Sequence, residues 1–337
     1  MKTVRLALFV AMAILLAARA LPSTQGVVFQ TTVAALSDED IASPCRYELT
    51  IFNRSRPIRA VWVIFDRGRD MLRYYGDSYV QAFAEQHDLA LLLPFQCRAK
   101  SYEDMNVDPA NGLGRALFAA LAQFAESSHH PELASARLIL LGFSGAGSLV
   151  ARLTDYRPDR VIAAIPVDPG HFDPLGMDTV NLSREAMAAP QLILAGGADT
   201  VSGTRRPYEY FRRHFDQGAP WTFVVQNNTP HCCIINAKNL MLDWLAAILE
   251  QGQRSTASPQ RIDQRTGWLA FMTTRETDTK DSWGGNTSSV TAATIERFGA
   301  RAPRGITTPA GWLPTQRVAK EWLSFVKQTE HPVTSLP

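Results

Sequence analysis

A serine flanked by small residues follows a strongly apolar segment near the middle of the chain. Residues 138–147 read LILLGFSGAG, with Ser144 between Phe143 and Gly145. The apolar run is typical of a strand buried on both faces, and the small residues allow a tight turn from that strand into a helix. A serine hydroxyl is a weak nucleophile at neutral pH, so it needs a neighbouring base and a third group that orients the base. The pattern makes Ser144 a candidate nucleophile.

Two polar residues that could serve as the base and the orienting group lie downstream. Asp199 follows an apolar run at 191–195 and a pair of glycines, and His231 follows a run at 221–226 that we predict to be the last strand. An imidazole can accept the proton of the serine hydroxyl, and a carboxylate can hold the imidazole in the required tautomer. We therefore predict Ser144 as nucleophile, His231 as base and Asp199 as acid.

The order and placement of these residues resemble the α/β-hydrolase family. That family carries Gly-x-Ser-x-Gly in a sharp turn after a strand, followed along the chain by the acid and then the histidine. This chain has Ala146 in place of the last glycine, and Gly147 follows at once. The resemblance covers residues 45–250 and implies an acyl-enzyme mechanism that needs neither a metal ion nor a cofactor.

Each partner of Ser144 has a competitor in the sequence. Asp168 directly follows the apolar run at 160–167, and some α/β-hydrolases carry the acid at that strand end. We favour Asp199 over Asp168 as the acid. Of the other histidines, His171 is the one near a strand end, where it could line a pocket.

Cleavage of an ester or amide also requires donors aimed at the developing oxyanion, each typically contributing about 3 kcal/mol. The backbone N–H of Gly145, directly after the nucleophile, is the first expected donor. The resemblance places the second donor in the loop after the third strand, where relatives often carry His-Gly. This chain has Arg67 before Gly68, and we predict the backbone N–H of Arg69 as the second donor.

Short apolar runs alternate with longer amphipathic ones from about residue 45 to 249. This alternation predicts strands joined by helical crossovers. The predicted strands span 47–52, 60–65, 89–94, 137–142, 160–167, 191–195 and 221–226, and the predicted helices span 78–86, 114–127, 146–154, 207–215 and 237–249. The expected fold is α/β, of the α/β-hydrolase type, with a mostly parallel central sheet covered by helices on both faces. Because few residues separate Asp168 from Gln191, we expect a small or absent cap.

The two ends of the chain differ from this central part. Residues 1–20 have basic residues, an apolar run and a small-residue cleavage pattern, which predict a signal peptide and a secreted or periplasmic protein. The apolar run is shorter than the roughly 20 residues that span a bilayer, so no stable membrane insertion is expected after cleavage.

A polar stretch from residue 251 predicts a boundary between a catalytic domain at 21–250 and a C-terminal extension at 251–337. The extension carries four tryptophans and one predicted helix at 316–327. It could pack on the hydrolase domain, which we favour, or form part of the substrate-binding rim.

The charge of the chain bears on its main class of partner. A net charge of +2 with evenly spread basic residues argues against nucleic acid as the main partner.

The chain has four cysteines. In an oxidising compartment, Cys45, Cys97, Cys232 and Cys233 can form two disulfides in three pairings. We expect Cys97 to pair with one cysteine of the Cys232–Cys233 doublet, because both should lie on the same rim.

These observations predict a secreted serine hydrolase that cleaves carboxylic esters through an acyl-enzyme on Ser144. An open site suits esters of bulky, polymeric or lipid-like molecules. A secreted serine peptidase of the same fold and a catalytically silent binding protein are the alternatives.

Overall fold

The computed structural model describes residues 26–65, 69–95, 97, 100, 108–170, 181–253, 262–300, 303–306 and 308–331. The predicted signal peptide, Gly68 and His171 lie outside these ranges, and so do the side chains of Arg69 and Asp70.

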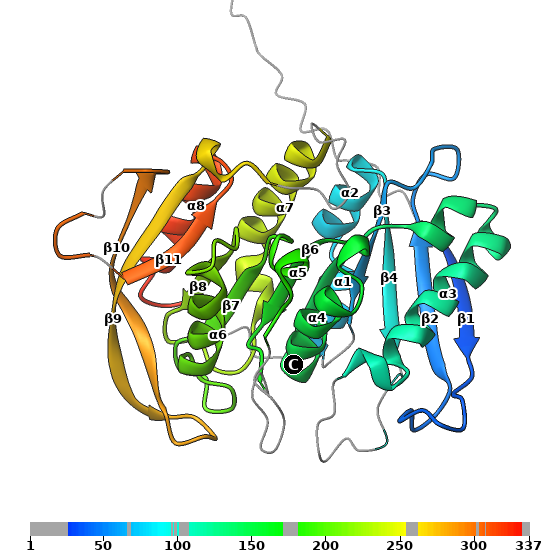
Figure 1. Ribbon diagram of the computed structural model, residues 1–337, viewed down its shortest axis with the longest axis horizontal. Coiled ribbons are helices and arrows are strands. Elements are labelled where there is room, and N and C mark those ends of the chain that lie inside the picture. The colour runs from blue at the N-terminus through cyan, green and yellow to red at the C-terminus, as the bar shows by residue number, and fades with distance from the viewer. Residues whose placement is uncertain are drawn as a thin grey trace, which may run out of the picture.

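One 11-stranded sheet runs through the described part of the chain, in the order β1-β2-β4-β3-β5-β6-β7-β8-β11-β9-β10 (Figure 1). The strands are β1 (Val27–Val33), β2 (Cys45–Ile51), β3 (Ala60–Ile64), β4 (Leu89–Phe95), β5 (Leu138–Phe143), β6 (Val161–Val167), β7 (Leu192–Gly196), β8 (Thr222–Gln226), β9 (Trp268–Lys280), β10 (Asn286–Arg297) and β11 (Thr308–Leu313). The strands from β4 to β8 in this order are parallel, and the strands outside them pair antiparallel. A mixed sheet with a parallel centre confirms the predicted fold class.

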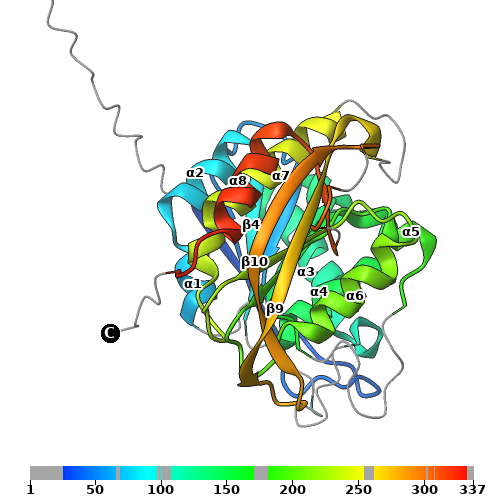
Figure 2. The same ribbon diagram turned by 90° about the vertical axis from the view of Figure 1, so that its left-hand side faces the viewer.

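Helices cover both faces of the sheet, as Figure 2 shows edge-on. On one face lie α1 (Arg69–Tyr75), α2 (Ser78–Gln86), α7 (Lys238–Gln253) and α8 (Gln316–Val326). On the other face lie α3 (Leu113–Ser128), α4 (Gly145–Tyr156), α5 (Arg184–Met187) and α6 (Arg205–Phe215). Parallel strands need such crossover connections, because the chain must return from the carboxyl end of one strand to the amino end of the next.

Side chains of β3, β4 and β5 alternate between two hydrophobic clusters. In β3, Val61 and Val63 join the cluster that includes residues of α3 and α4, whereas Trp62 and Ile64 join the cluster that includes residues of α2, α7 and α8. Every residue of β3 is buried. A strand that is covered on both faces has no solvent side, which explains its continuous apolar sequence.

The strands and helices predicted between residues 45 and 249 are all present, and their ends agree to within two residues except at α7, which extends to Gln253. Two expectations need correction. First, β1 was not predicted. Second, the strand at 221–226 is not the last, because β9, β10 and β11 follow it and continue the same sheet.

The C-terminal strands attach to the sheet through β11. Gly311 lies opposite Thr222 of β8, with a φ of +128°, and a Cβ there would collide with the carbonyl oxygen of Trp221. Only glycine combines this φ with so close an approach of two backbones. Trp312 and Trp322 are fully buried, and Trp322 Nε1 donates to Phe223 O at 3.0 Å. The division into domains at residue 250 remains a prediction.

Replacing Trp322 by alanine is expected to destabilise the whole fold, because its ring lies in the hydrophobic cluster that also includes residues of α2 and α7, and not in a separate core. The expected loss is about 3–5 kcal/mol of unfolding free energy, measured by denaturant titration. The matched control is Lys320→Ala on the exposed side of α8, which should change stability by less than about 0.5 kcal/mol. Equal and small effects of both substitutions would mean that α8 does not support the sheet.

The disulfides differ from the expected pairing. Cys45 is bonded to Cys97, and Cys232 is bonded to its neighbour Cys233, so the predicted bridge between Cys97 and the doublet is wrong. The register of β2 and β4 explains the first bond, because Arg46 lies opposite Phe95 and brings the cysteines just beyond them together. The doublet follows β8, and four strands separate β8 from β4 in the sheet.

Among the described residues, no helix combines the length and the apolar character needed to cross a membrane.

Candidate active site

Ser144 occupies a strained turn between β5 and α4. Its φ of +57° and ψ of −125° lie outside the regions favoured by residues other than glycine, a cost that often marks a functional position. The turn is fixed from both sides: the N–H of Ser144 donates to Val167 O at 2.9 Å, and Gly147 N–H donates to Ser144 O at 2.8 Å. A Cβ at Gly142 would collide with the backbone of Ala146, so the small residues permit the close packing of strand and helix.

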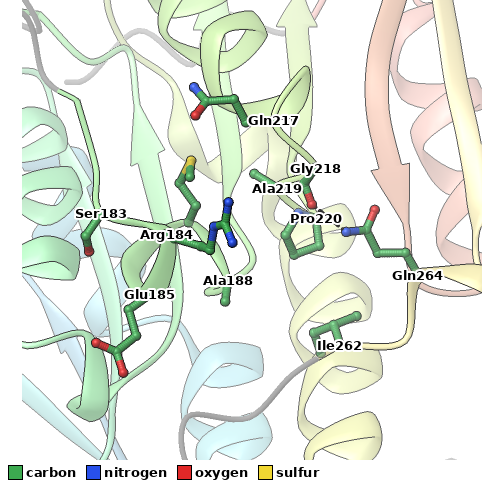
Figure 3. Close-up of a pocket in the computed structure, with 11 residues that line it drawn as sticks. Ser183, Arg184, Glu185, Ala188, Gln217, Gly218, Ala219, Pro220, Ile262 and Gln264 are labelled. Carbon is green, nitrogen blue, oxygen red and sulfur yellow. Dashed lines mark hydrogen bonds between the residues drawn. The ribbon is translucent and has the colours of Figure 1, made fainter.

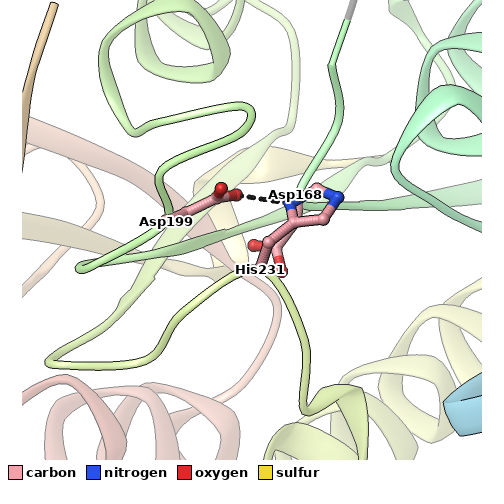
Figure 4. A group of neighbouring side chains, drawn as sticks. All are labelled: Asp168, Asp199 and His231. Atoms are coloured by element: carbon pink, nitrogen blue, oxygen red, sulfur yellow. Dashed lines mark hydrogen bonds and ion pairs between the residues drawn. The ribbon is translucent and has the colours of Figure 1, made fainter. Parts of the chain in front are cut away.

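Asp199 lies in the loop after β7 and is fully buried. Its Oδ1 accepts the backbone N–H of Val201 at 2.7 Å and that of Ser202 at 2.9 Å. Aspartate commonly bonds to the backbone two residues ahead in turns. These bonds fix the carboxylate and leave Oδ2 to accept from Nδ1 of His231 at 2.8 Å (Figure 4).

His231 lies in the loop after β8, and its side chain is 17% exposed. Its ring packs against the ring of Phe143, the residue before Ser144, with a centroid separation of 4.7 Å. An ionised carboxylate can only accept a hydrogen bond, so Nδ1 donates to Asp199 and carries the proton of the neutral ring. Nε2 is then the acceptor that a serine hydroxyl needs.

The structure therefore brings Asp199 and His231 into direct contact beside the turn of Ser144. All three follow the carboxyl ends of parallel strands, which lie on the same edge of the sheet and commonly hold the ligand in α/β folds. Their catalytic roles remain predictions.

Asp168, the competing acid, also lies at this edge and is completely buried at the end of β6. Its Oδ1 accepts the N–H of Gly196 at 2.7 Å. Burial first, and then the neighbouring Asp199, raise the pKa of Asp168 well above its usual range. The carboxyl oxygens of Asp168 and Asp199 and a ring nitrogen of His231 lie within 4.8 Å of one another. In this structure His231 is bonded to Asp199 and not to Asp168, which fits the preferred assignment.

The predicted oxyanion donors are both first residues of helices. Gly145 begins α4, so its N–H has no acceptor within the helix. Arg69 begins α1, which follows β3, and β3 is the neighbour of β5. Residues 66–68 between β3 and α1 lie outside the described part of the chain. The role of Arg69 therefore stays a prediction.

The C-terminal hairpin also reaches this edge, and the sequence offered a place at the substrate-binding rim only as the less favoured alternative for this segment. The turn between β9 and β10 packs on the loop of Asp199: Ser282 Oγ donates to Thr200 O at 3.1 Å, and Asp281 lies so close to Gly203 that no Cβ would fit there. Trp283 in the same turn lies under the guanidinium of Arg206, 4.3 Å from the ring centroid. The only sequence signal was the presence of tryptophan in an otherwise polar segment.

A cavity of about 720 Å³ lies at the opposite edge of the sheet (Figure 3). Its lining comes from 183–185, 187–188, 217–220, Ile262 and Gln264. The first two of these segments precede β7 and β8, so they lie at the amino ends of the strands, whereas Asp199 and His231 follow the carboxyl ends. This cavity is therefore separate from the candidate active site.

No family model and no curated protein matches the chain. Solved structures do match it. They include a fluorophosphonate-binding serine hydrolase, FphF, from Staphylococcus aureus, with 12% identity over 67% of this chain and 99% of that chain and a TM-score of 0.45. They also include an S-formylglutathione hydrolase from Agrobacterium tumefaciens, with 15% identity over 67% and 96% of the two chains and a TM-score of 0.47. A hyperthermophilic esterase from the archaeon Pyrobaculum calidifontis matches with 13% identity over 66% and 85% and a TM-score of 0.45. Similarities at this level leave the chemistry to be argued from the residues of this chain.

Proposed function

We propose that this protein is a serine hydrolase that cleaves carboxylic esters through an acyl-enzyme on Ser144. The observation that carries the proposal is the hydrogen bond from His231 to Asp199, made by a histidine whose ring packs beside the strained turn of Ser144. This arrangement supplies an oriented base next to a nucleophile whose side chain is partly exposed.

The reaction proceeds in two steps. Nε2 of His231 accepts the hydroxyl proton while Oγ of Ser144 bonds to the ester carbonyl carbon, and the N–H of Gly145 donates to the developing oxyanion. The carbon–oxygen bond to the alcohol then breaks, and the alcohol leaves with the proton from His231. Water loses a proton to the same nitrogen as it attacks the acyl carbon, the bond from that carbon to Oγ breaks, and Oγ takes the proton back from His231 as the acid leaves.

The proposed substrates are esters of bulky, polymeric or lipid-like molecules, and the proposed location is secreted or periplasmic. The short connection between Asp168 and Gln191 supports a small or absent cap. The bonded pairs Cys45–Cys97 and Cys232–Cys233 support an oxidising compartment.

A fluorophosphonate probe tests the proposal, because it forms a stable covalent bond with an activated serine. The wild-type protein should be labelled, and Ser144→Ala should not be labelled while its circular dichroism spectrum is unchanged. Ser127→Ala, which alters an exposed serine on α3, is the matched control and should label like the wild type. A folded wild-type protein that stays unlabelled would instead favour a catalytically silent binding protein.

The bonded doublet after His231 leads to a separate prediction. A bond between adjacent cysteines closes a small ring, which restrains the backbone next to the histidine, and Cys233 has a φ of +69°. Replacing both Cys232 and Cys233 by serine is expected to lower kcat about 10-fold through misplacement of His231. The matched variant, Cys45→Ser with Cys97→Ser, should lower the unfolding free energy by about 2–4 kcal/mol with little change in kcat. The reverse pattern would show that the doublet acts on stability alone.

A further inference from the structure

We propose that Asp168 is a positioning residue that carries a proton, serving as a neutral carboxylic acid between the acid loop and the histidine loop. The effect of Asp168 on catalysis rests on the proposed function, whereas the protonation of Asp168 can be tested by stability measurements that need no enzyme activity.

The starting point is the distance between two buried carboxyl groups. Asp168 and Asp199 are both inaccessible to solvent, and carboxyl oxygens of the two lie within 4.8 Å of each other (Figure 4). Two negative charges this close in a buried site repel strongly, because the surrounding medium screens them poorly. One of the two groups must therefore hold a proton.

Hydrogen bonds decide which group holds it. Asp199 accepts three donors, namely the N–H groups of Val201 and Ser202 and Nδ1 of His231. Oδ1 of Asp168 accepts the N–H of Gly196, and its Oδ2 is buried without a partner among the described residues. Donors stabilise the charged form of a carboxyl group. The negative charge consequently belongs on Asp199 and the proton on Asp168.

Asp168 also connects β7 with the loop that carries Asp199, and one of its carboxyl oxygens lies within 4.8 Å of a ring nitrogen of His231. Its carboxyl group bonds to Gly196 at the end of β7, and its carbonyl oxygen accepts from Ser202 Oγ at 2.9 Å in the loop of Asp199. As a neutral acid, Asp168 can make these contacts without repelling the Asp199 carboxylate that orients His231.

The first test measures thermal stability against pH for wild type and Asp168→Asn. Among the described residues, the titratable groups that face Asp168 are Asp199 and His231. Because the pKa of Asp168 is raised on folding, the native state binds more protons than the unfolded state above the ordinary aspartate pKa of about 4. The contribution of the protonated Asp168 to the free energy of unfolding is fully present below about pH 4, and it is lost as pH rises towards the pKa that Asp168 has in the folded state. Asparagine does not titrate, so the midpoint of Asp168→Asn should rise relative to wild type between pH 4 and 8, by on the order of a few degrees.

Asp159→Asn is the control, because folding lowers the pKa of Asp159 whereas it raises the pKa of Asp168. The guanidinium of Arg157 holds the pKa of Asp159 below its usual range, so wild type should gain slightly on this variant as pH rises to about 4 and should keep that advantage unchanged at higher pH. If the midpoint of Asp168→Asn falls relative to wild type between about pH 4 and 8, or stays level as expected for the control, Asp168 is ionised and the proposal is wrong.

The second test uses ester turnover to assess the positioning role. Asp168→Ala removes the acceptor for Gly196 and should lower kcat at least 10-fold with little change in KM, whereas Asp168→Asn should keep kcat within about 3-fold of wild type. Rescue by asparagine supports a neutral group. A loss in Asp168→Asn as large as that in Asp168→Ala would show that the charge is required and would overturn the proposal. An inactive wild-type protein that still shows the pH trend would refute the proposed function and leave the protonated carboxyl group standing.

Discussion

Ser144→Ala is expected to reduce kcat for a p-nitrophenyl ester by on the order of 10⁴-fold or more. The substitution removes the atom that would bond to the acyl carbon, and no acyl-enzyme can form. The strained backbone at this position does not depend on the hydroxyl, since the bonds that fix the turn involve the backbone of Ser144 and its neighbours. The variant should therefore fold normally, and steady-state kinetics with a circular dichroism control will measure the loss.

His231→Ala should cause a loss of similar size, and combining it with Ser144→Ala should add almost nothing. Residues that act as one unit show this non-additivity, because removing either one already disables the proton transfer and the attack together. Losses that multiplied in the double variant would mean that the two residues contribute independently, contrary to the proposed mechanism.

Asp199→Asn is expected to lower kcat by about 10⁴-fold. The carboxylate accepts the Nδ1 proton of His231, but an amide placed there can also donate to that nitrogen. The ring would then carry its proton on Nε2, where it could no longer accept from Ser144. The rate of p-nitrophenol release measures the effect.

The matched control for this substitution is Asp263→Asn, which changes an exposed aspartate whose neighbour Gln264 bonds to Gly218, in the segment before β8. It should leave kcat unchanged. If Asp199→Asn were harmless and Asp168→Asn were severe, the acid would be Asp168, and both the assignment and the protonation argument would be wrong.

Much of the parallel sheet could be predicted because its strands are buried on both faces. Such strands leave a continuous apolar run, and β3, β5 and β6 are examples. The outer strands leave a weaker signal. In β1, exposed and partly buried residues alternate, and in β9 the second half is mostly polar, because these strands have a solvent side. Pairing partners far away in the chain, and not a local pattern, make them strands.

The disulfides show the same limit at the level of single residues. We expected Cys97 to bond to the Cys232–Cys233 doublet because both follow predicted strands on the same side. The Cys45–Cys97 bond depends instead on the antiparallel register of β2 and β4, which the local sequence does not give. Likewise, the contact of Ser282 with the loop of Asp199 depends on how far the β9–β10 hairpin extends beyond β11.

The sequence by itself determined which residues could perform the chemistry and the strand ends where Ser144, Asp199 and His231 would lie, because continuous apolar runs mark the buried strands that these residues follow. Only the tertiary structure decided which carboxylate bonds to His231. Asp168 and Asp199 both follow buried strands, and the sequence favoured Asp199 without excluding Asp168. They differ in the donors that surround them, and those donors come from separate loops that folding alone brings together.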